Sequence, residues 1–162
     1  VTFAVTVASE TPGNDSASVT ISEEDSADNT GTFTITQGGD ALAGTNTASV
    51  TVTVSGTATD ADFTLADGTP LDYTAIVAAI QAAATAASIA VSAADGDSLV
   101  LTWDASDPTS FGVDLTAFDD NLLDSPEALT LTLSDATIVD GTAIITTASG
   151  TLQIIDADII LG

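Results

Sequence analysis

Lysine, arginine, histidine, cysteine and methionine are all absent from this sequence, which holds 24 Asp and Glu residues in 162 positions. No side chain can therefore serve as the counter-ion of a carboxylate. Two carboxylates about 4 Å apart repel by about 1 kcal/mol in water and by about 4 kcal/mol at an effective dielectric constant near 20. Clustered acids thus need protonation, salt or a bound cation, and the lack of basic residues excludes nucleic acid and anionic membrane surfaces as partners.

The missing residue types also exclude most catalytic chemistry. Without His, Lys or Cys there are no nucleophilic triads, Schiff bases or thiolates. Carboxylate-pair chemistry such as glycoside hydrolysis needs a substrate cleft, which is usually lined with aromatic residues, and aromatics make up only 4% of the chain. Zinc and copper sites lack their soft and imidazole ligands. We therefore predict a protein that is not an enzyme.

No disulfide can hold this chain together, because it has no cysteine. With 44% apolar residues it can still form one domain with a core. For an extracellular domain of this size, a bound metal is the stabilising cross-link that is still available. Because residue 1 is not Met and no basic signal region is present, we expect a mature fragment or an excised repeat.

Alternation of Thr with Val, Ile and Leu predicts a mainly β protein. Such alternation is typical of half-buried strands, and short strands in this number favour a β-sandwich. The predicted strands span residues 1–7, 18–22, 31–36, 48–55, 129–134, 142–147 and 150–155.

One stretch departs from the β pattern. Thr74 to Ala94 carries no charge over 21 residues, which is the length of a membrane span, but it is mostly Ala and lacks flanking Lys or Arg. We predict no membrane insertion and instead a helix from about Asp72 to Ala87, capped by Asp72 or Thr74. Its predicted buried stripe consists of Ile76, Val77, Ile80, Ala83, Ala84 and Ala87.

A β-hairpin is predicted after this helix. Strands 88–92 and 98–103 flank an Asp95-Gly96 turn, so the helix and hairpin form an αββ insertion into the sandwich. Trp103, Phe111 and Phe118 could line a sugar site. The favoured interpretation is that they form core at the base of the insertion.

The acidic residues cluster where predicted strands begin or end. In an antiparallel sandwich the connections gather at two ends, so four acidic segments can meet at one pole. Calcium accepts six to eight oxygen ligands at about 2.3–2.6 Å and would neutralise such a pole; a solvated, salt-adapted surface is the alternative. The candidate calcium ligands are Glu23, Glu24, Asp60, Asp62, Asp119, Asp120, Asp124, Glu127, Asp156 and Asp158.

Four segments resemble motifs of the Calx-β family. Residues 119–127, Asp-Asp-Asn-Leu-Leu-Asp-Ser-Pro-Glu, precede an alternating strand and are similar to that family's D-D-x-x-x-[ED]-x-x-E. Residues 56–63, with Asp-Phe after Gly-Thr-Ala, are similar to its G-T-A-x-x-x-D-[YF]. Residues 22–25 resemble its E-G-[DN] turn, and residues 150–158 resemble its final strand with terminal acids.

This resemblance covers about residues 17–65 and 117–158 and implies an immunoglobulin-like sandwich that binds calcium at one end. Glu24 replaces the family's usual Gly, so either Glu23 or Glu24 is the ligand there. The other ligands that the resemblance implies are Asp62, Asp119, Asp120, Asp124, Glu127, Asp156 and Asp158.

The rest of the chain departs from the family pattern. About residues 71–116 have no counterpart in it and resemble small αββ units of flagellin-type variable regions. Strand 1–7 precedes the family's first strand. We therefore expect an N-terminal strand or linker (1–16), a sandwich (17–158) interrupted by the αββ insertion at about 71–116, and the start of a linker (159–162).

These observations predict a non-catalytic, extracellular calcium-binding module of a large bacterial cell-surface protein. Neighbouring repeats or identical subunits are the expected partners, and cell-surface or glycan targets remain open. The alternative is a self-assembling subunit of an extracellular filament or surface layer, in which strand 1–7 pairs with the sheet of another subunit.

Overall fold

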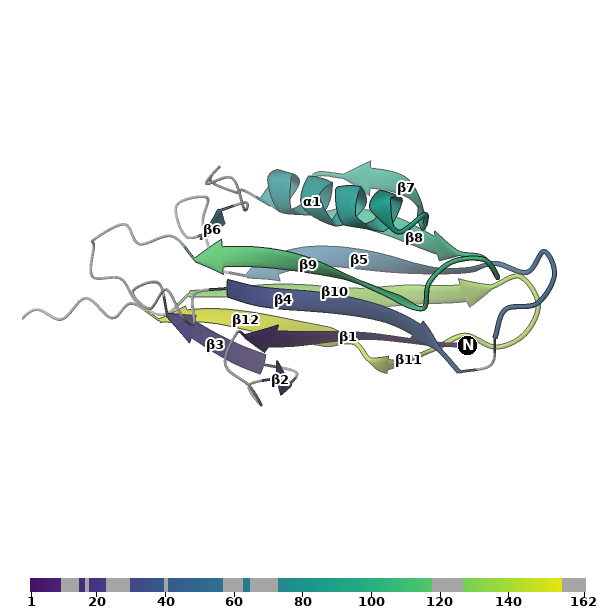
Figure 1. Ribbon diagram of the computed structural model, residues 1–162, viewed down its shortest axis with the longest axis horizontal. Helices are drawn as coiled ribbons and strands as arrows, with labels where there is room; N and C mark the ends of the chain where they lie inside the picture. Colours follow the sequence, from purple (N-terminus) through teal and green to yellow (C-terminus); the bar gives the residue numbers. More distant parts are fainter. Residues whose placement is uncertain are drawn as a thin grey trace, which may run out of the picture.

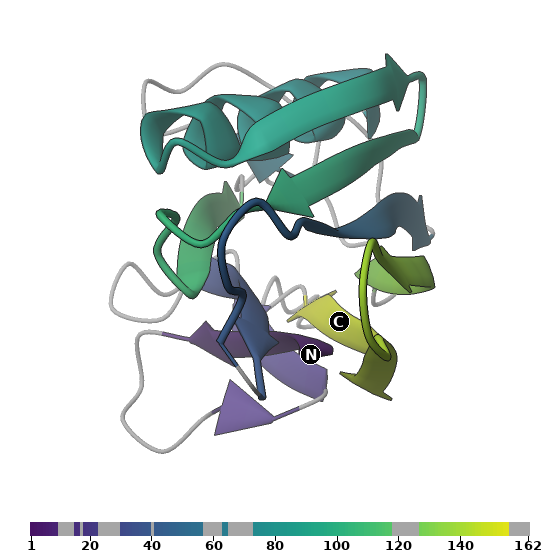
Figure 2. The same cartoon turned by 90° about the vertical axis from the view of Figure 1, so that its right-hand side faces the viewer.

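A computed structural model describes residues 1–9, 15–16, 18–22, 30–39, 41–56, 63–64, 73–117 and 127–155. Two β-sheets pack face to face, and one helix lies along one side of them (Figures 1 and 2). The elements are β1 (Thr2–Ser9), β2 (Asp15–Ser16), β3 (Ser18–Ser22), β4 (Thr30–Gly38), β5 (Ala48–Gly56), β6 (Phe63–Thr64), α1 (Tyr73–Ala86), β7 (Ala90–Asp95), β8 (Ser98–Trp103), β9 (Ser110–Ala117), β10 (Glu127–Ile138), β11 (Ile144–Thr147) and β12 (Ser149–Ile155). The predicted mainly β, immunoglobulin-like sandwich is confirmed.

The two sheets hold different parts of the chain. Sheet A has the order β11-β1-β4-β9-β6, with β2 also paired to β1, and sheet B has the order β3-β12-β10-β5-β8-β7. Only the β1–β11 and β3–β12 pairs are parallel among the pairs of described strands. The strands are thus mostly antiparallel, which lets one face of each sheet meet the core and the other meet solvent.

Two segments pass from one sheet to the other with a single residue between their strands. Residues 15–16 pair with β1 in sheet A and residues 18–22 pair with β12 in sheet B. Residues 144–147 and 149–155 do the same, and the Ala148 carbonyl between them accepts a 2.6 Å hydrogen bond from Leu133 N. These crossings join the two sheets along the side that holds β1 and β12.

The N-terminal strand belongs to its own sandwich in this structure. β1 pairs with β4 on one side and with β11 and β2 on the other. Phe3, Val5 and Val7 alternate as predicted and are buried. Residues 1–9 therefore form an interior strand of sheet A.

The core follows from the strict alternation of the strands. Along β4 and β5 every second side chain is buried, as period-2 geometry requires. Full burial of each Val, Ile, Leu or Phe contributes about 1.5–3 kcal/mol. On the outward face, small hydroxyl residues pair across strands, as in the 2.8 Å contact of Ser49 with Thr102 and the 2.9 Å contact of Thr130 with Thr151.

Helix α1 covers the part of sheet B that extends past sheet A. It contacts β7, β8, β5 and β9, and its apolar residues belong to the common core. Of the predicted stripe, Ile76, Val77, Ile80 and Ala84 are buried, whereas Ala83 and Ala87 are partly buried. Among the described residues, no helix is both long enough and apolar enough to cross a membrane.

One of the two residues predicted to cap the N-terminus of α1 is not at the cap position. Thr74 is the second residue of α1, and its hydroxyl donates a 3.3 Å hydrogen bond to Gly96 O in the hairpin turn. The option of Thr74 as the N-cap was therefore wrong. Asp72 lies outside the described residues.

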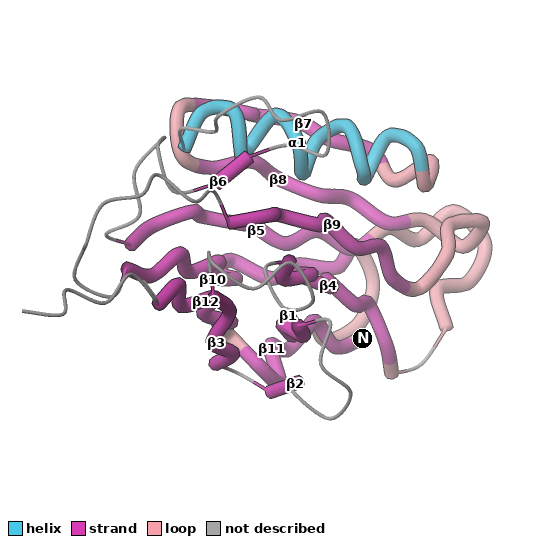
Figure 3. The backbone as a smooth tube through the Cα atoms, turned by 60° about the vertical axis from the view of Figure 1, so that its left-hand side comes forward, coloured by secondary structure: helices cyan, strands magenta, loops and turns pink. Residues whose placement is uncertain are grey.

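The predicted hairpin is present with two shifts. β7 begins at Ala90 because Ser88, with φ of 66°, turns the chain after the helix. Asp95 pairs with Ser98, so the turn is Gly96-Asp97 and not Asp95-Gly96. Because β8 also pairs with β5, the αββ unit adds two strands to sheet B (Figure 3).

The strand predictions missed β2, β6 and β9 and ended β10 too early. β9 was missed, although Phe111, Val113 and Leu115 alternate and are buried beside β4. β10 continues to Ile138 instead of ending at 134, because a register shift between Ser134 and Thr137 absorbs Asp135, whose φ is 52°. Asp tolerates this left-handed conformation better than most residues, and such a β-bulge kinks a strand without ending it.

Candidate functional site

Four strands of sheet B have their ends at one pole of the molecule. In the register of the sheet, Ser22 is paired with Ile155, Ile154 with Glu127, and Leu129 with Gly56. The last residues of β3, β12 and β5 therefore lie beside the first residues of β10, at the left-hand end of Figure 1. We call this end, defined by Ser22, Gly56, Glu127 and Ile155, the Glu127 pole.

Sheet A adds three strand ends to the same pole. Thr30 is paired with Thr116, and Phe63 with Ala117. β4 and β6 therefore begin, and β9 ends, at the left-hand end of Figure 1. All four acidic segments are attached to strand ends at the Glu127 pole, since they lie between Ser22 and Thr30, between Gly56 and Phe63, between Ala117 and Glu127, and after Ile155.

The predicted ligands themselves lie almost entirely outside the described residues. Glu127 is the first residue of β10. Glu23, Glu24, Asp60, Asp62, Asp119, Asp120, Asp124, Asp156 and Asp158 are outside the description. Within the described ranges, no group of three or more acidic side chains could hold a metal ion. The ligand set thus remains a prediction.

The backbone at the Glu127 pole is closely packed. Gly56 has φ of 133°, and a Cβ placed there would lie 2.2 Å from the carbonyl oxygen of Ala128. Only glycine fits such a conformation against a neighbouring strand. The end of β5 and the start of β10 are therefore held tightly together.

The donor chemistry available at this pole is that of a hard cation. The four attached segments supply carboxylates, while the sequence has no Lys, Arg or His that could pair with them. Calcium accepts carboxylate and carbonyl oxygens in flexible geometry. The oxygen donors that the sequence provides in these segments are of the type that calcium accepts.

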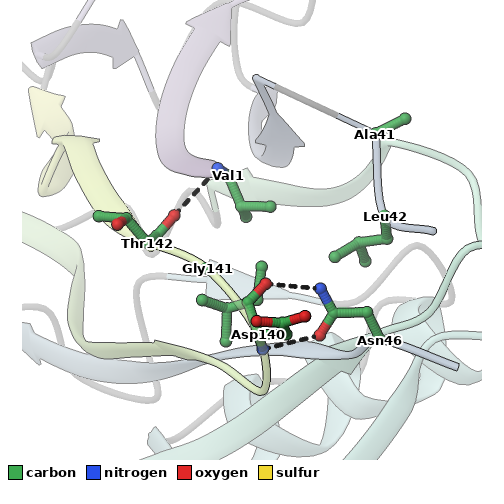
Figure 4. A pocket seen from close by; sticks show the side chains of 8 residues that line it. Val1, Ala41, Leu42, Asn46, Asp140, Gly141 and Thr142 are labelled. Carbon is green, nitrogen blue, oxygen red and sulfur yellow. Dashed lines mark hydrogen bonds between the residues drawn. The ribbon is translucent and has the colours of Figure 1, made fainter.

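The opposite end of the sandwich is different. We call it the Asp140 pole and define it by Val1, Asn46, Asp140 and Thr142. The Asn46 amide donates a 2.9 Å hydrogen bond to Asp140 O and accepts a 3.1 Å hydrogen bond from Asp140 N, so it holds the β10–β11 connection through main-chain atoms (Figure 4). A cavity of about 310 Å³ lies here, lined by Val1, Ala41, Leu42, Asn46, Ile138, Asp140, Gly141 and Thr142.

A second acidic feature that sequence analysis missed lies between β8 and β9. The Asp104 carboxylate accepts hydrogen bonds from Ser106 Oγ at 2.6 Å and from Ser106 N at 2.8 Å. These bonds lower the pKa of Asp104 below its ordinary value. The signal for it was the Asp-x-Ser spacing of an Asx turn before Pro108, and its role is to fix the loop.

Trp103 is a core residue. Its side chain has no exposed surface, its ring centroid lies 5.5 Å from that of Phe3 and 6.2 Å from that of Phe111, and its Nε1 donates a 3.1 Å hydrogen bond to Pro108 O. The sugar-site interpretation of Trp103 was therefore wrong. Phe118 lies outside the described residues.

The sequence matches no protein-family model and no curated protein. Its structure is similar to that of CBD12 from CALX1.2, with a TM-score of 0.50, 15% identity and 98% of this chain covered; the chain spans 46% of that structure's length. It is also similar to the Calx CBD2 domain, with a TM-score of 0.51, 10% identity, and 96% and 86% of the two chains covered. At these identities the comparisons show the fold, and the chain shares the β-sandwich architecture of Calx CBD domains.

Proposed function

We propose that this chain is a non-catalytic, calcium-binding structural module that binds calcium at the Glu127 pole. The observation that carries the proposal is the common position of the strand ends, which attaches all four acidic segments to one end of the sandwich. Without a basic side chain in the sequence, the repulsion between neighbouring carboxylates favours uptake of a cation.

The proposed ligands are the acidic residues of those four segments. Six to eight oxygens are needed for calcium, so ligands from several segments must cooperate. Asp119 and Asp120 would reach the ion from the β9–β10 connection, and Glu127 from the start of β10. Glu23 or Glu24, Asp60, Asp62, Asp124, Asp156 and Asp158 complete the candidate set.

Calcium at this pole would join segments that are far apart in sequence. The β3 end at Ser22 and the β12 end at Ile155 belong to opposite ends of the chain. An ion shared between their acidic extensions would stiffen both strand ends and the point where the chain leaves the domain. This property suits an extracellular repeat of a bacterial surface protein, which must resist extension. The strand-exchange alternative would require β1 to leave its sheet and expose Phe3, Val5 and Val7, which are buried in this structure.

Differential scanning calorimetry tests the proposal. We expect calcium at millimolar concentration to raise the melting temperature far more than magnesium at equal ionic strength, because calcium accepts more oxygen ligands. A ligand that binds only the folded state stabilises by about 2.7 kcal/mol at 100 times its Kd. Sodium chloride at equal ionic strength is the control for general screening. Equal effects of all three salts would refute a specific site.

A further inference from the structure

Gln37, near the end of β4, is a polar side chain on the core face of the sandwich. Its exposed fraction is 7%, and among the side chains that the structure describes it is the only polar one that is buried. It is paired with Phe3 of β1, and its backbone N donates a 2.7 Å hydrogen bond to Thr109 O, just before β9. A buried polar group in such a position costs free energy unless each of its polar atoms has a partner.

Only one half of the Gln37 amide has such a partner. Nε2 donates a 3.1 Å hydrogen bond to Gly38 O. No residue in the described part of the chain donates a hydrogen bond to Oε1. The amide oxygen is thus a buried acceptor that is available to a ligand.

Gln37 lines a cavity together with two carboxylates. The cavity has a volume of about 140 Å³ and is lined by residues of the β4–β5 and β8–β9 connections, among them Asp104 and Asp107. β4 and β8 both end at the right-hand end of Figure 1, so the cavity lies at the opposite end of the molecule from the Glu127 pole.

The two carboxylates are held in place and still have acceptor capacity. Ser106 donates hydrogen bonds from N and Oγ to Oδ1 of Asp104, and Asp104 N donates a 2.9 Å hydrogen bond to Oδ2 of Asp107. An ionised carboxylate has about four acceptor positions on its two oxygens. Both carboxylates therefore keep positions for a further partner, and the sequence has no Lys, Arg or His that could supply it.

The chemistry of this cavity is that of a cation site. The neighbouring donors, which are Gln37 Nε2, Asp104 N and Ser106 N, are all used in the bonds described above, so acceptors remain. Carboxylate and amide oxygens are ligands that calcium takes in proteins. One water needs about 10–15 Å³ of such a volume, so a cavity of about 140 Å³ has room for an ion and several of its waters.

We propose that Gln37, Asp104 and Asp107 form a second, weak calcium site, which we call the Gln37 site. It uses none of the ligands proposed at the Glu127 pole, so it does not depend on the proposed function. Three residues supply fewer than the six to eight oxygens that calcium accepts, so water completes the shell and we expect a Kd of about 10⁻³ M. At that calcium concentration the site is half occupied and adds little to stability. The bound ion would join the β4–β5 connection to the β8–β9 connection.

Terbium luminescence tests this site, because the single tryptophan of the chain lies next to it. Terbium(III) is a hard cation that binds the oxygen ligands of calcium, and it emits when a nearby indole transfers energy to it. Trp103 directly precedes Asp104, and its Nε1 bonds to Pro108 O in the same connection.

Trp103 is also far from the Glu127 pole. It is paired with Ala48, and Gly56 lies at the other end of the 9-residue strand β5, about 27 Å away. Energy transfer falls steeply with distance. Terbium emission excited through Trp103 therefore reports on the Gln37 site and not on the Glu127 pole.

We expect the unaltered chain to give this emission and calcium to displace the terbium. Asp107→Asn keeps the acceptor for Asp104 N but removes a charge, and Gln37→Leu removes the amide oxygen. Each should weaken terbium binding about tenfold, the equivalent of one charge-assisted contact. Gln37→Glu supplies a third carboxylate and should strengthen it by a similar factor. Asp114→Asn, at an exposed position on β9, is the matched control and should leave the titration unchanged.

A buried amide oxygen that is satisfied by water alone is the competing explanation. It predicts no Trp103-excited emission, or emission that Asp107→Asn and Gln37→Leu leave unchanged, and either result would overturn the proposal. Gln37→Leu removes an unpaired acceptor from the core, so we expect it to fold, and circular dichroism checks this. Asp107→Asn changes only a loop residue and keeps the test decisive if Gln37→Leu does not fold.

The same titrations, repeated on Glu127→Gln, separate this inference from the proposed function. Trp103-excited emission should be the same in Glu127→Gln as in the unaltered chain, and its loss there would refute a separate site. Emission in a chain whose melting temperature does not respond to calcium would refute the proposed function and support the Gln37 site. A calcium-dependent melting temperature without emission would do the reverse.

Discussion

The two poles of this sandwich differ in the partners that are available to their acidic segments. At the Asp140 pole, the carboxyl-bearing loops are held by uncharged partners: Asn46 bonds the main chain of Asp140, and Ser106 bonds the carboxylate of Asp104. At the Glu127 pole, four acidic segments are attached to adjacent strand ends, and the sequence offers no basic side chain to pair with them. The comparison teaches that hydrogen bonds from uncharged side chains hold the loops of Asp104 and Asp140, whereas for the grouped acids we propose neutralisation by a cation from solution.

Alanine substitution of the two glycines with φ near 130° compares the rigidity of the two poles. Gly56→Ala at the Glu127 pole should lower the free energy of unfolding most, because the new Cβ would lie 2.2 Å from Ala128 O. Gly141→Ala at the Asp140 pole meets only Ile138 Cδ1 at 3.7 Å, so it pays the backbone strain alone, about 1–3 kcal/mol. Urea denaturation without calcium measures both. Equal losses would show that the Glu127 pole can relax.

Removing a carboxylate at the Glu127 pole should reduce the stabilisation by calcium. Removing the carboxylate of Asp140 at the Asp140 pole should leave that stabilisation unchanged. Asp120→Asn or Glu127→Gln should lose most of the calcium-dependent stabilisation, about 2.7 kcal/mol at 100 times Kd. The metal-free variants should be as stable as the unaltered chain or more so, because one repelling charge is gone. Asp140→Asn, whose main-chain atoms make the bonds to Asn46, is the control. Melting with and without calcium checks all three, and a loss of the calcium effect in Asp140→Asn would contradict this assignment of the poles.

The hydrogen bonds at the Asp140 pole should act independently of the metal. Asn46→Ala removes the two bonds to the main chain of Asp140 and should cost about 1–2 kcal/mol. The cost should be the same with and without calcium, since the pair lies at the other end of the molecule. Thr45→Ala, at an exposed neighbouring position, serves as control in the same denaturation series. A cost that appears only with calcium would mean that the poles are coupled.

The smallest expected effect concerns the pKa of Asp104. Ser106→Ala removes the hydroxyl bond that is the largest cause of its lowered pKa, so that pKa should rise toward the ordinary value. Because the folded-state pKa is depressed, Asp104 favours folding above its unfolded pKa, and this contribution is lost as pH falls through the folded-state pKa. The variant should thus lose less stability on acidification. Carboxyl-detected NMR titration checks this, with Ser110→Ala, an exposed serine on β9, as reference.

Local pattern was enough to predict most of the elements. The alternation of Thr with Val and Ile predicted β3 with its bounds, and the stripe around Ile80 predicted α1 within one residue at each end. The pattern failed where a local signal conflicts with a strand. Gly112 and Asp114 weakened the alternation of β9, and Asp135 resembled a strand end but sits in a bulge that long-range pairing with β5 preserves.

The sequence by itself determined that this protein is a β-sandwich with a neutral core, and that its acids can find no counter-ion within the chain. These properties follow from composition and from period-2 burial, which are local. Only the tertiary structure decided that β1 is paired within its own sheet, that β8 extends sheet B past β5, and that the ends of β3, β5, β10 and β12 share one pole. Strand order and register depend on contacts between residues far apart in the chain, and no local pattern encodes which strand will be a neighbour.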